Sequence, residues 1–157
     1  MKAITIWQPW AQLIAVGAKR IETRPWATSY RGEILIHAGK KSFYEGVRLL
    51  PMSAQYRLRR LFEPNGDDRL RVDAIGYLDR HFPTGAIIGK AKLVNCVQID
   101  VLTQELIRKQ HPEEYAVGDF TVGRFGWILE EPELFKNPIP ASGKQRLWEY
   151  NGNLEEA

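Results

Sequence analysis

The chain of 157 residues contains a single cysteine, Cys96, and three widely separated histidines, His37, His81 and His111. One cysteine cannot form an internal disulfide, and the histidines do not follow the spacing of a zinc-binding motif. The sequence also has no glycine-rich phosphate-binding loop and no GxSxG nucleophile motif. We therefore predict no metal site, no cofactor, no nucleotide-binding loop of the common types and no classical serine or cysteine hydrolase.

Long hydrophobic runs are absent as well. The longest uncharged stretch, residues 3–18, is shorter than the about 20 apolar residues that a membrane-spanning helix needs. The first residues lack the basic segment, apolar core and cleavage site of a secretion signal. We therefore expect a cytoplasmic protein without a membrane partner. With 44% hydrophobic and 26% charged residues, the composition predicts one globular domain over residues 1–157.

The net charge of +3 is unevenly distributed along the chain. Residues 19–41 contain six basic and two acidic residues, whereas residues 81–157 contain eight basic and eleven acidic ones. A basic segment of this kind is typical of a surface that contacts an anion, and nucleic acid is the commonest large anion. A solvated charged surface explains the composition equally well.

The pattern of apolar residues predicts both strands and helices. Strands are expected at residues 2–7, 20–26, 33–38, 86–97, 126–130 and 146–150. Helices are expected at residues 10–16 before Gly17, at residues 42–62 with a break at Pro51, and at residues 104–110 after a cap at Thr103. The polar segment up to about residue 80 is predicted to be poorly ordered.

These elements favour an α+β fold, because the strands do not alternate regularly with long helices. We expect a small, mixed, partly closed β-barrel of five or six strands with flanking helices. A helical and loop insertion is predicted around residues 42–80.

Most large aromatic side chains are expected in the core. Trp7 and Trp10 precede or occupy the apolar face of the first helix, and Trp127 and Trp148 lie within predicted strands. His37 lies in an apolar strand, where a buried structural histidine is the expectation.

One short segment, directly after the first predicted helix, brings together two cations and a carboxylate. Strand alternation places Glu22 and Arg24 on one face and Thr23 on the other, and Lys19 lies at the corner between helix and strand. A carboxylate between two cations holds both cationic chains in place, and such a group is suited to grip a phosphate or a base edge. Spacing alone slightly favours the simpler alternative, a surface ion-pair cluster on an edge strand.

This segment also resembles a known family motif. Gly17-x-Lys19-x-x-Glu22-x-Arg24 is similar to the GxKxxExR signature of the ASCH (activating signal cointegrator-one homology) domain family. The preceding WQPWA at residues 7–11 resembles the HQPWA element of one branch, and RGEILIHA at residues 31–38 resembles its RGxLxIxA strand. The resemblance extends to residues 85–97 and 147–149 and is weakest from about residue 50 to residue 80.

The resemblance implies a PUA-like β-barrel with a cleft between barrel and helix, lined by the signature residues. It implies RNA, in particular single-stranded RNA, or a nucleotide-like ligand as the binding partner. Some family members cleave single-stranded RNA, and a bacterial branch hydrolyses N4-acetylcytidine with the signature lysine and a threonine three positions later. Lys19 matches that lysine, but the position three later is Glu22, which departs from the amidohydrolase pattern.

Two functions use these residues differently. A nucleic-acid-binding module contacts phosphates through cations and stacks bases on aromatic side chains. The candidate binding residues are Lys19, Glu22, Arg24, Trp26, Tyr30, Lys40, Lys41 and Arg124. A small hydrolase acting on RNA or a modified nucleoside would use Lys19 as a catalytic base and Glu22 as the catalytic group that orients it or activates water.

A third possibility is a protein-interaction adaptor. The basic, amphipathic stretch at residues 55–62 would dock an acidic protein partner, and only the charge pattern supports this.

Between the first two functions, a carboxylate beside Lys19 favours the protonated amine, which suits binding better than base catalysis.

Overall fold

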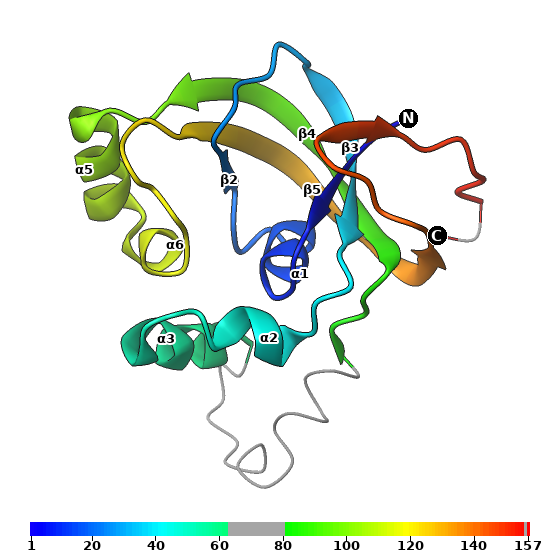
Figure 1. Ribbon diagram of the computed structural model, residues 1–157, viewed down its shortest axis with the longest axis horizontal. Helices are drawn as coiled ribbons and strands as arrows, with labels where there is room; N and C mark the ends of the chain where they lie inside the picture. Colours follow the sequence, from blue (N-terminus) through cyan, green and yellow to red (C-terminus); the bar gives the residue numbers. More distant parts are fainter. Residues whose placement is uncertain (63–80, 156) are drawn as a thin grey trace, which may run out of the picture.

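The computed structural model describes residues 1–62, 81–155 and 157, and its backbone is a curled sheet with helices on its flanks (Figure 1). The side chains of residues 59–62 and the stretch 63–80, where poor order was predicted, lie outside the described residues. In chain order the elements are β1 (Lys2–Ile6), α1 (Trp10–Ala15), β2 (Ile21–Arg24), β3 (Gly32–Ala38), α2 (Phe43–Val47), α3 (Met52–Phe62), β4 (Ala86–Gln98), α5 (Val101–Gln110), α6 (Pro112–Ala116), β5 (Phe125–Pro140) and β6 (Leu147–Glu149).

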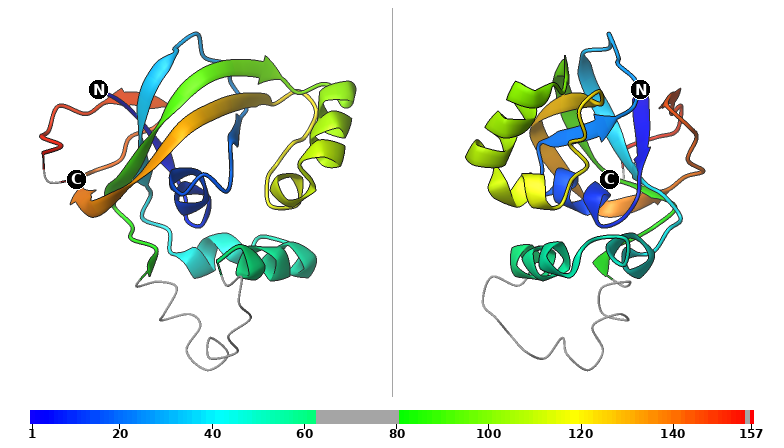
Figure 2. Two further views of the ribbon diagram at one scale, coloured as in Figure 1. Left: turned by 180° about the vertical axis from the view of Figure 1, so that it is seen from behind. Right: turned by 60° about the vertical axis from the view of Figure 1, so that its left-hand side comes forward.

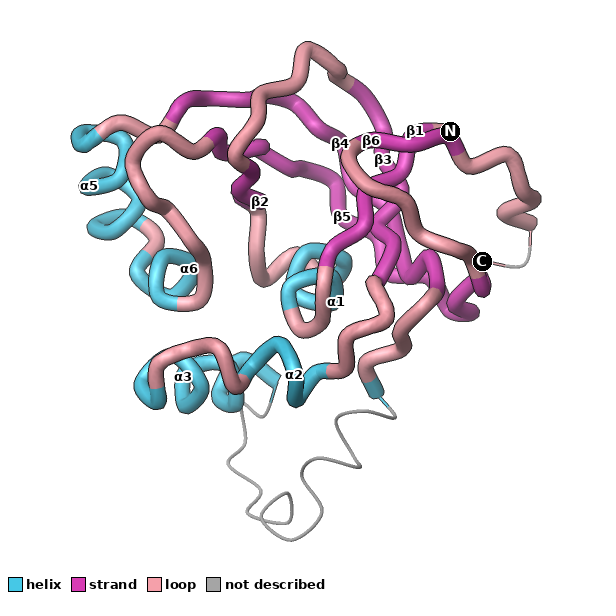
Figure 3. The backbone as a smooth tube through the Cα atoms, in the orientation of Figure 1, coloured by secondary structure: helices cyan, strands magenta, loops and turns pink. Residues whose placement is uncertain are grey.

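Six strands form one sheet in the order β2-β5-β4-β3-β1-β6 (Figure 3). β1 pairs with β3 in parallel, and every other pair in this sheet is antiparallel. Register shifts between β4 and β5 mark irregularities of the bulge type, which bend strands and increase their twist. The sheet curls into a half-barrel, so the predicted α+β, barrel-like architecture of six strands with flanking helices is confirmed.

Helix α1 lies inside the curve of the sheet (Figure 2). Its residues Ala11, Ile14 and Ala15 belong to the main core cluster, together with apolar side chains from β1, β3, β4 and β5. The helix ends at Ala15, and Gly17 follows with a φ of 79°, in the left-handed region that favours glycine. The chain then turns into β2, which places the basic segment directly beside the buried helix.

The remaining helices form two groups outside α1 (Figures 1 and 2). Ser42 caps α2 through a capping box with Glu45, and Pro51 separates α2 from α3, as the sequence predicts. Leu58 of α3 packs with Leu13 of α1 and with Val117, which follows α6. Within the described part of the chain, no helix is long and apolar enough to cross a membrane.

The start of α5 differs from the prediction. Asp100 caps the helix, because its Oδ1 accepts a hydrogen bond from the backbone N–H of Thr103 at 2.7 Å, so the prediction of Thr103 as the cap was wrong. Both residue types are favourable caps, and the helix uses the earlier one. Pro112 was expected only beyond the end of this helix, but it begins the further helix α6, where its missing N–H costs nothing.

Strand β5 is much longer than the predicted residues 126–130. Pro132 and Pro138 interrupt its apolar pattern and hide the continuation to Pro140 from sequence analysis. The strand accommodates the irregularity through register shifts against β4 and through a positive φ of 49° at Glu131.

The tryptophans follow the prediction with one exception. Trp127 and Trp148 are buried, and Trp10 packs against the main core cluster. Trp7 was expected in the core, but 42% of it is exposed, so that prediction was wrong. The reason is that β1 ends at Ile6, and Trp7 therefore lies in the turn before α1 rather than on a strand or helix face.

His37 is buried in β3, as expected. Its Nε2 lies 3.0 Å from the carbonyl oxygen of Ala141, and its ring contacts the Trp148 ring edge to face at a centroid distance of 5.7 Å. Nδ1 has no hydrogen-bond partner among the described residues. Burial lowers the pKa of His37 from its ordinary value of 6.5, against the opposing effect of the Ala141 hydrogen bond.

We predict that acid destabilises the protein through His37. A group whose pKa is lower in the folded state binds protons preferentially in the unfolded state, so the free energy of unfolding falls as the pH drops below 6.5. Urea unfolding between about pH 7.5 and pH 5 measures this slope. His37→Gln removes most of the slope, whereas His111→Gln, at an exposed position, keeps it. The opposite pattern would contradict the assignment.

Candidate ligand-binding cleft

A cleft of about 510 Å³ opens beside α1, between the corner that joins β1 to α1, strand β2 and the segment after α6. This volume is within the range of about 300–1,000 Å³ that is typical of small-ligand sites. The apolar part of its wall consists of Ile6, Trp7, Trp10, Leu49, Leu50 and Val117. The charged part consists of Lys19, Glu22, Arg24, Asp119 and Arg124.

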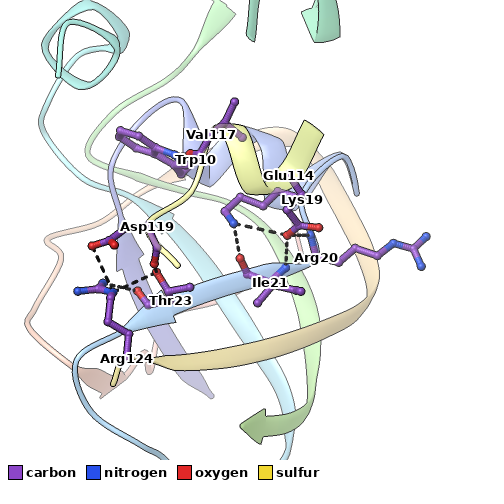
Figure 4. A network of polar contacts seen from close by, with 9 residues as sticks. All are labelled: Trp10, Lys19, Arg20, Ile21, Thr23, Glu114, Val117, Asp119 and Arg124. Carbon is purple, nitrogen blue, oxygen red and sulfur yellow. Dashed lines mark hydrogen bonds and ion pairs between the residues drawn. The ribbon is translucent and has the colours of Figure 1, made fainter. Parts of the chain in front are cut away.

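Lys19 is buried at the inner wall of this cleft (Figure 4). Its Nζ donates a hydrogen bond to the carbonyl oxygen of Ile21 and lies 3.5 Å from Glu114 Oε1. Nζ also lies 5.0 Å from the ring centroid of Phe120. A carboxylate, a carbonyl oxygen and an aromatic ring therefore surround the Lys19 amine and hold it in place.

Glu114 connects α6 to the corner between α1 and β2. The same Oε1 that faces Lys19 accepts backbone hydrogen bonds from Arg20 at 2.9 Å and from Ile21 at 2.5 Å. One carboxylate oxygen therefore satisfies two N–H groups at the start of β2 and neutralises the buried amine. The sequence had suggested Glu22 as the partner of Lys19, but the carboxylate that contacts Lys19 is Glu114.

Glu22 and Arg24 lie on the same face of β2, as strand alternation predicts. Glu22 Oε1 lies 3.2 Å from Arg24 Nε, and Arg24 Nη2 donates to the carbonyl oxygen of Thr5 at 2.8 Å. Nη1 of Arg24 has no acceptor among the described residues. The guanidinium is thus fixed by two contacts and retains uncommitted donors.

Arg124 is held in a similar way on the neighbouring wall (Figure 4). Its Nη2 donates to the carbonyl oxygen of Thr23 at 3.0 Å, and its Nε lies 3.3 Å from Asp119 Oδ2. Burial raises the pKa of the Asp119 carboxyl, but hydrogen bonds from Thr121 and the charge of Arg124 outweigh burial and lower the pKa overall. Nη1 of Arg124, like that of Arg24, has no acceptor in the described part of the chain.

Each cation in the wall therefore has its own carboxylate. The three pairs are Lys19 with Glu114, Arg24 with Glu22, and Arg124 with Asp119. The cleft is consequently close to electrically neutral, although it is rich in hydrogen-bond donors. Such a wall suits a flat, polar, uncharged group better than a phosphate, because a phosphate would have to compete with the bound carboxylates.

Four of the predicted binding residues lie outside the cleft lining: Trp26, Tyr30, Lys40 and Lys41. Trp26 packs edge to face on Trp127 at a centroid distance of 4.7 Å, and the Tyr30 hydroxyl donates to the carbonyl oxygen of Glu33 at 2.7 Å. Lys40 and Lys41 are exposed after β3, and Lys41 Nζ lies 3.7 Å from the ring centroid of Trp7. Lys41 thus reaches the edge of the cleft through Trp7.

Glu114 and Asp119 were not identified from the sequence. Glu114 is 95 residues from Lys19, so no local spacing connects the two. The only local signal is the proline with two following acidic residues, Pro112, Glu113 and Glu114, which is typical of a first helical turn. That signal locates a helix but not its partner. Among the described residues, no group of three or more His, Cys, Asp or Glu is placed to hold a metal ion.

The fold and the signature residues belong to a known class of domain. The model of the ASCH domain family matches residues 4–147, and the chain therefore belongs to the ASCH domain family. This confirms the resemblance inferred from residues 17–24.

Two curated relatives have the same degree of similarity. Activating signal cointegrator 1 of Mus musculus and of Homo sapiens are each 29% identical to the chain over 154 residues, which is 98% of the chain and 23% of either relative. The chain thus spans about a quarter of the length of these relatives.

Among solved structures, the crystal structure of ASCH from Zymomonas mobilis aligns with a TM-score of 0.51 at 15% sequence identity. The alignment covers 88% of this chain and 72% of that one. At this identity the likeness shows the fold alone.

We predict that Glu114 is the main stabilising residue of the cleft. Glu114→Ala leaves a buried cation and two backbone N–H groups without partners, and its cost is about 3–5 kcal/mol in the free energy of unfolding. Glu114→Gln keeps an acceptor without the charge and has an intermediate effect. Chemical denaturation measures the free energy of unfolding of the wild type and of both variants.

The matched control for this prediction is the preceding residue. Glu113 pairs with Arg57 on the surface at 3.0 Å, and Glu113→Ala costs less than about 1 kcal/mol. Equal effects of the Glu113 and Glu114 substitutions would refute the role assigned to the buried pair.

Proposed function

We propose that the cleft binds a base of single-stranded RNA, or a nucleotide-like ligand with such a base. The observation that carries the proposal is the combination of two fixed guanidinium groups, Arg24 and Arg124, with an aromatic wall. Each guanidinium has an uncommitted Nη1 donor, and both residues line the cleft beside Trp7 and Trp10. Bases offer acceptors at their edges and flat faces for stacking, which is what such a wall accommodates.

Phosphates would bind outside the cleft. Lys40 and Lys41 are exposed, and neither forms an ion pair with a carboxylate among the described residues. Exposed lysines near a single-stranded chain release counterions when they contact phosphates, which makes binding dependent on salt. Trp26 and Tyr30 lie outside the cleft lining, so under this proposal they contact only bases that flank the bound one.

Membership of the ASCH family supports nucleic acid as the partner class, and the curated relatives are named activating signal cointegrators. A protein partner is the competing proposal for the basic stretch at residues 55–62. The affinity for a protein partner would depend only weakly on salt, whereas the affinity for RNA depends on it steeply, and this difference distinguishes the two proposals.

Hydrolysis is the second candidate activity, with Lys19 and Glu22 as the catalytic residues. The contacts of Lys19 argue against its use as a base, because its ammonium is held by Glu114 and the Ile21 carbonyl. Glu22 is likewise committed to Arg24. The contacts of both residues therefore favour a role in shaping the cleft and binding its ligand over a role in proton abstraction.

The proposal predicts a specific loss of RNA affinity when Arg124 is changed. Because an arginine bound to a base edge contributes about 1–3 kcal/mol, Arg124→Gln weakens binding of a labelled single-stranded RNA of ten nucleotides by about 5- to 150-fold. Fluorescence anisotropy measures the dissociation constant. Lys136→Ala, an exposed lysine of β5 outside the cleft, leaves it unchanged.

Salt dependence separates base contacts from phosphate contacts. A plot of log affinity against log salt concentration has a slope that is smaller by about 0.7 in Lys40→Ala and unchanged in Arg124→Gln.

A denaturing gel of the same RNA after incubation with the protein tests for cleavage. Cleavage that disappears in Glu22→Gln while binding persists would establish the hydrolase instead. A wild-type protein that binds neither RNA nor nucleosides would refute the proposal.

A further inference from the structure

Trp7 is the exposed tryptophan at the edge of the cleft, and sequence analysis had placed it in the core. It forms part of the cleft wall, and 42% of it is accessible to solvent. An indole ring is among the largest apolar groups in a protein, and a ring left this exposed beside a cleft is typical of a contact surface for a ligand.

The Trp7 ring is held in place although it is exposed. The carbonyl oxygen of Trp7 accepts the first hydrogen bond of α1, from the N–H of Ala11 at 3.1 Å. The ring edge lies against the backbone of Gly39, where an added Cβ would be 3.1 Å from Trp7 Cδ1. Lys41 Nζ lies over the ring at 3.7 Å from its centroid. The ring is thus positioned before any ligand binds.

The indole N–H also distinguishes Trp7 from the tryptophans that serve the fold. Trp10, Trp127 and Trp148 donate their indole N–H groups to Val117, Trp26 and Thr5, at 2.5, 3.4 and 3.2 Å respectively. Trp7 has no such acceptor among the described residues. The polar group of Trp7 is therefore available to a ligand in the cleft.

We propose that Trp7 is a stacking platform for an unpaired base of single-stranded RNA, with Lys41 contacting the adjacent phosphate. This inference rests on the proposed function and adds a residue to it. Lys41 Nζ lies over the ring and Lys41 is exposed, so under this proposal its flexible side chain moves from the ring to the phosphate of the nucleotide whose base takes its place on the ring. The aromatic ring and the cation together recognise one nucleotide without reading its sequence.

The test compares Trp7→Ala and Trp7→Phe with wild-type protein on the labelled RNA of ten nucleotides. Loss of one stacked base weakens binding by about 5- to 150-fold in Trp7→Ala, whereas Trp7→Phe keeps an aromatic face and stays within about threefold of wild type. Tyr44→Ala, which removes an exposed aromatic residue outside the cleft, is the matched control and leaves affinity unchanged. Denaturation midpoints confirm that the variants remain folded.

A second probe separates stacking from a structural effect. On an oligomer of abasic units of the same length, which has phosphates but no bases, Trp7→Ala binds as wild type does. Lys41→Ala reduces the salt slope by about 0.7 on both probes.

The outcomes distinguish the two proposals. If wild type binds the RNA and Trp7→Ala binds it equally well, Trp7 is not a platform, and the proposed function remains valid. Equal losses in Trp7→Ala and Trp7→Phe would also overturn the platform, because packing rather than an aromatic face would then be responsible. If wild type binds neither RNA nor nucleosides, both proposals are overturned.

Discussion

The carboxylate of Glu114 is the contact on which the shape of the cleft depends. It joins α6 to the start of β2 across 93–95 residues of sequence and binds a buried amine and two backbone N–H groups with one oxygen. Because α6 is only five residues long, it has little intrinsic helical stability, and this tertiary contact fixes it. The segment that follows α6 supplies Val117, Gly118 and Asp119 to the opposite wall. A second polar contact attaches the same wall to the signature segment, because the Thr23 hydroxyl donates to the carbonyl oxygen of Asp119 at 2.6 Å.

Because of this arrangement, the cleft is close to electrically neutral although it lies in a basic part of the sequence. The sequence indicates an excess of positive charge over residues 19–41, which suggests a phosphate-binding groove. In the fold, carboxylates from α6 and from the segment after it neutralise Lys19 and Arg124, and Glu22 neutralises Arg24. Lys40 and Lys41 form no ion pair with a carboxylate in the described part of the chain, and both are exposed outside the cleft lining. Local charge composition therefore does not reveal that the cations inside the cleft are paired with carboxylates.

The same distinction explains how much of the structure the sequence predicts. Strands β1 to β4 and helix α1 have clear local periodicities and glycine or proline boundaries, and their positions are recovered within a few residues. Strand β5 is only partly recovered, because Pro132 and Pro138 conceal a strand that irregular pairing with β4 holds together. Glu114 and the exposure of Trp7 are not recovered at all. Glu114 meets Lys19 only through the tertiary fold, which no spacing along the chain encodes, and the exposure of Trp7 depends on the exact residue at which β1 ends.

The spacing of the signature nevertheless has a physical reason in this chain. Gly17 adopts a positive φ, and an added Cβ would lie 2.9 Å from Pro132 Cγ, so the turn after α1 requires glycine. Two residues later, Lys19 points inward to Glu114, and Glu22 and Arg24 follow on one face of β2.

Arg24 then reaches the carbonyl oxygen of Thr5 on β1, although β2 and β1 are the first and fifth strands of the sheet order. The contact crosses the open side of the half-barrel and connects strands that share no backbone hydrogen bonds. The four signature residues thus form the turn, the attachment to α6 and the bridge that hold the cleft open. These structural roles are consistent with the proposed binding function, because Lys19 and Glu22 are already engaged in the ion pairs that maintain the site.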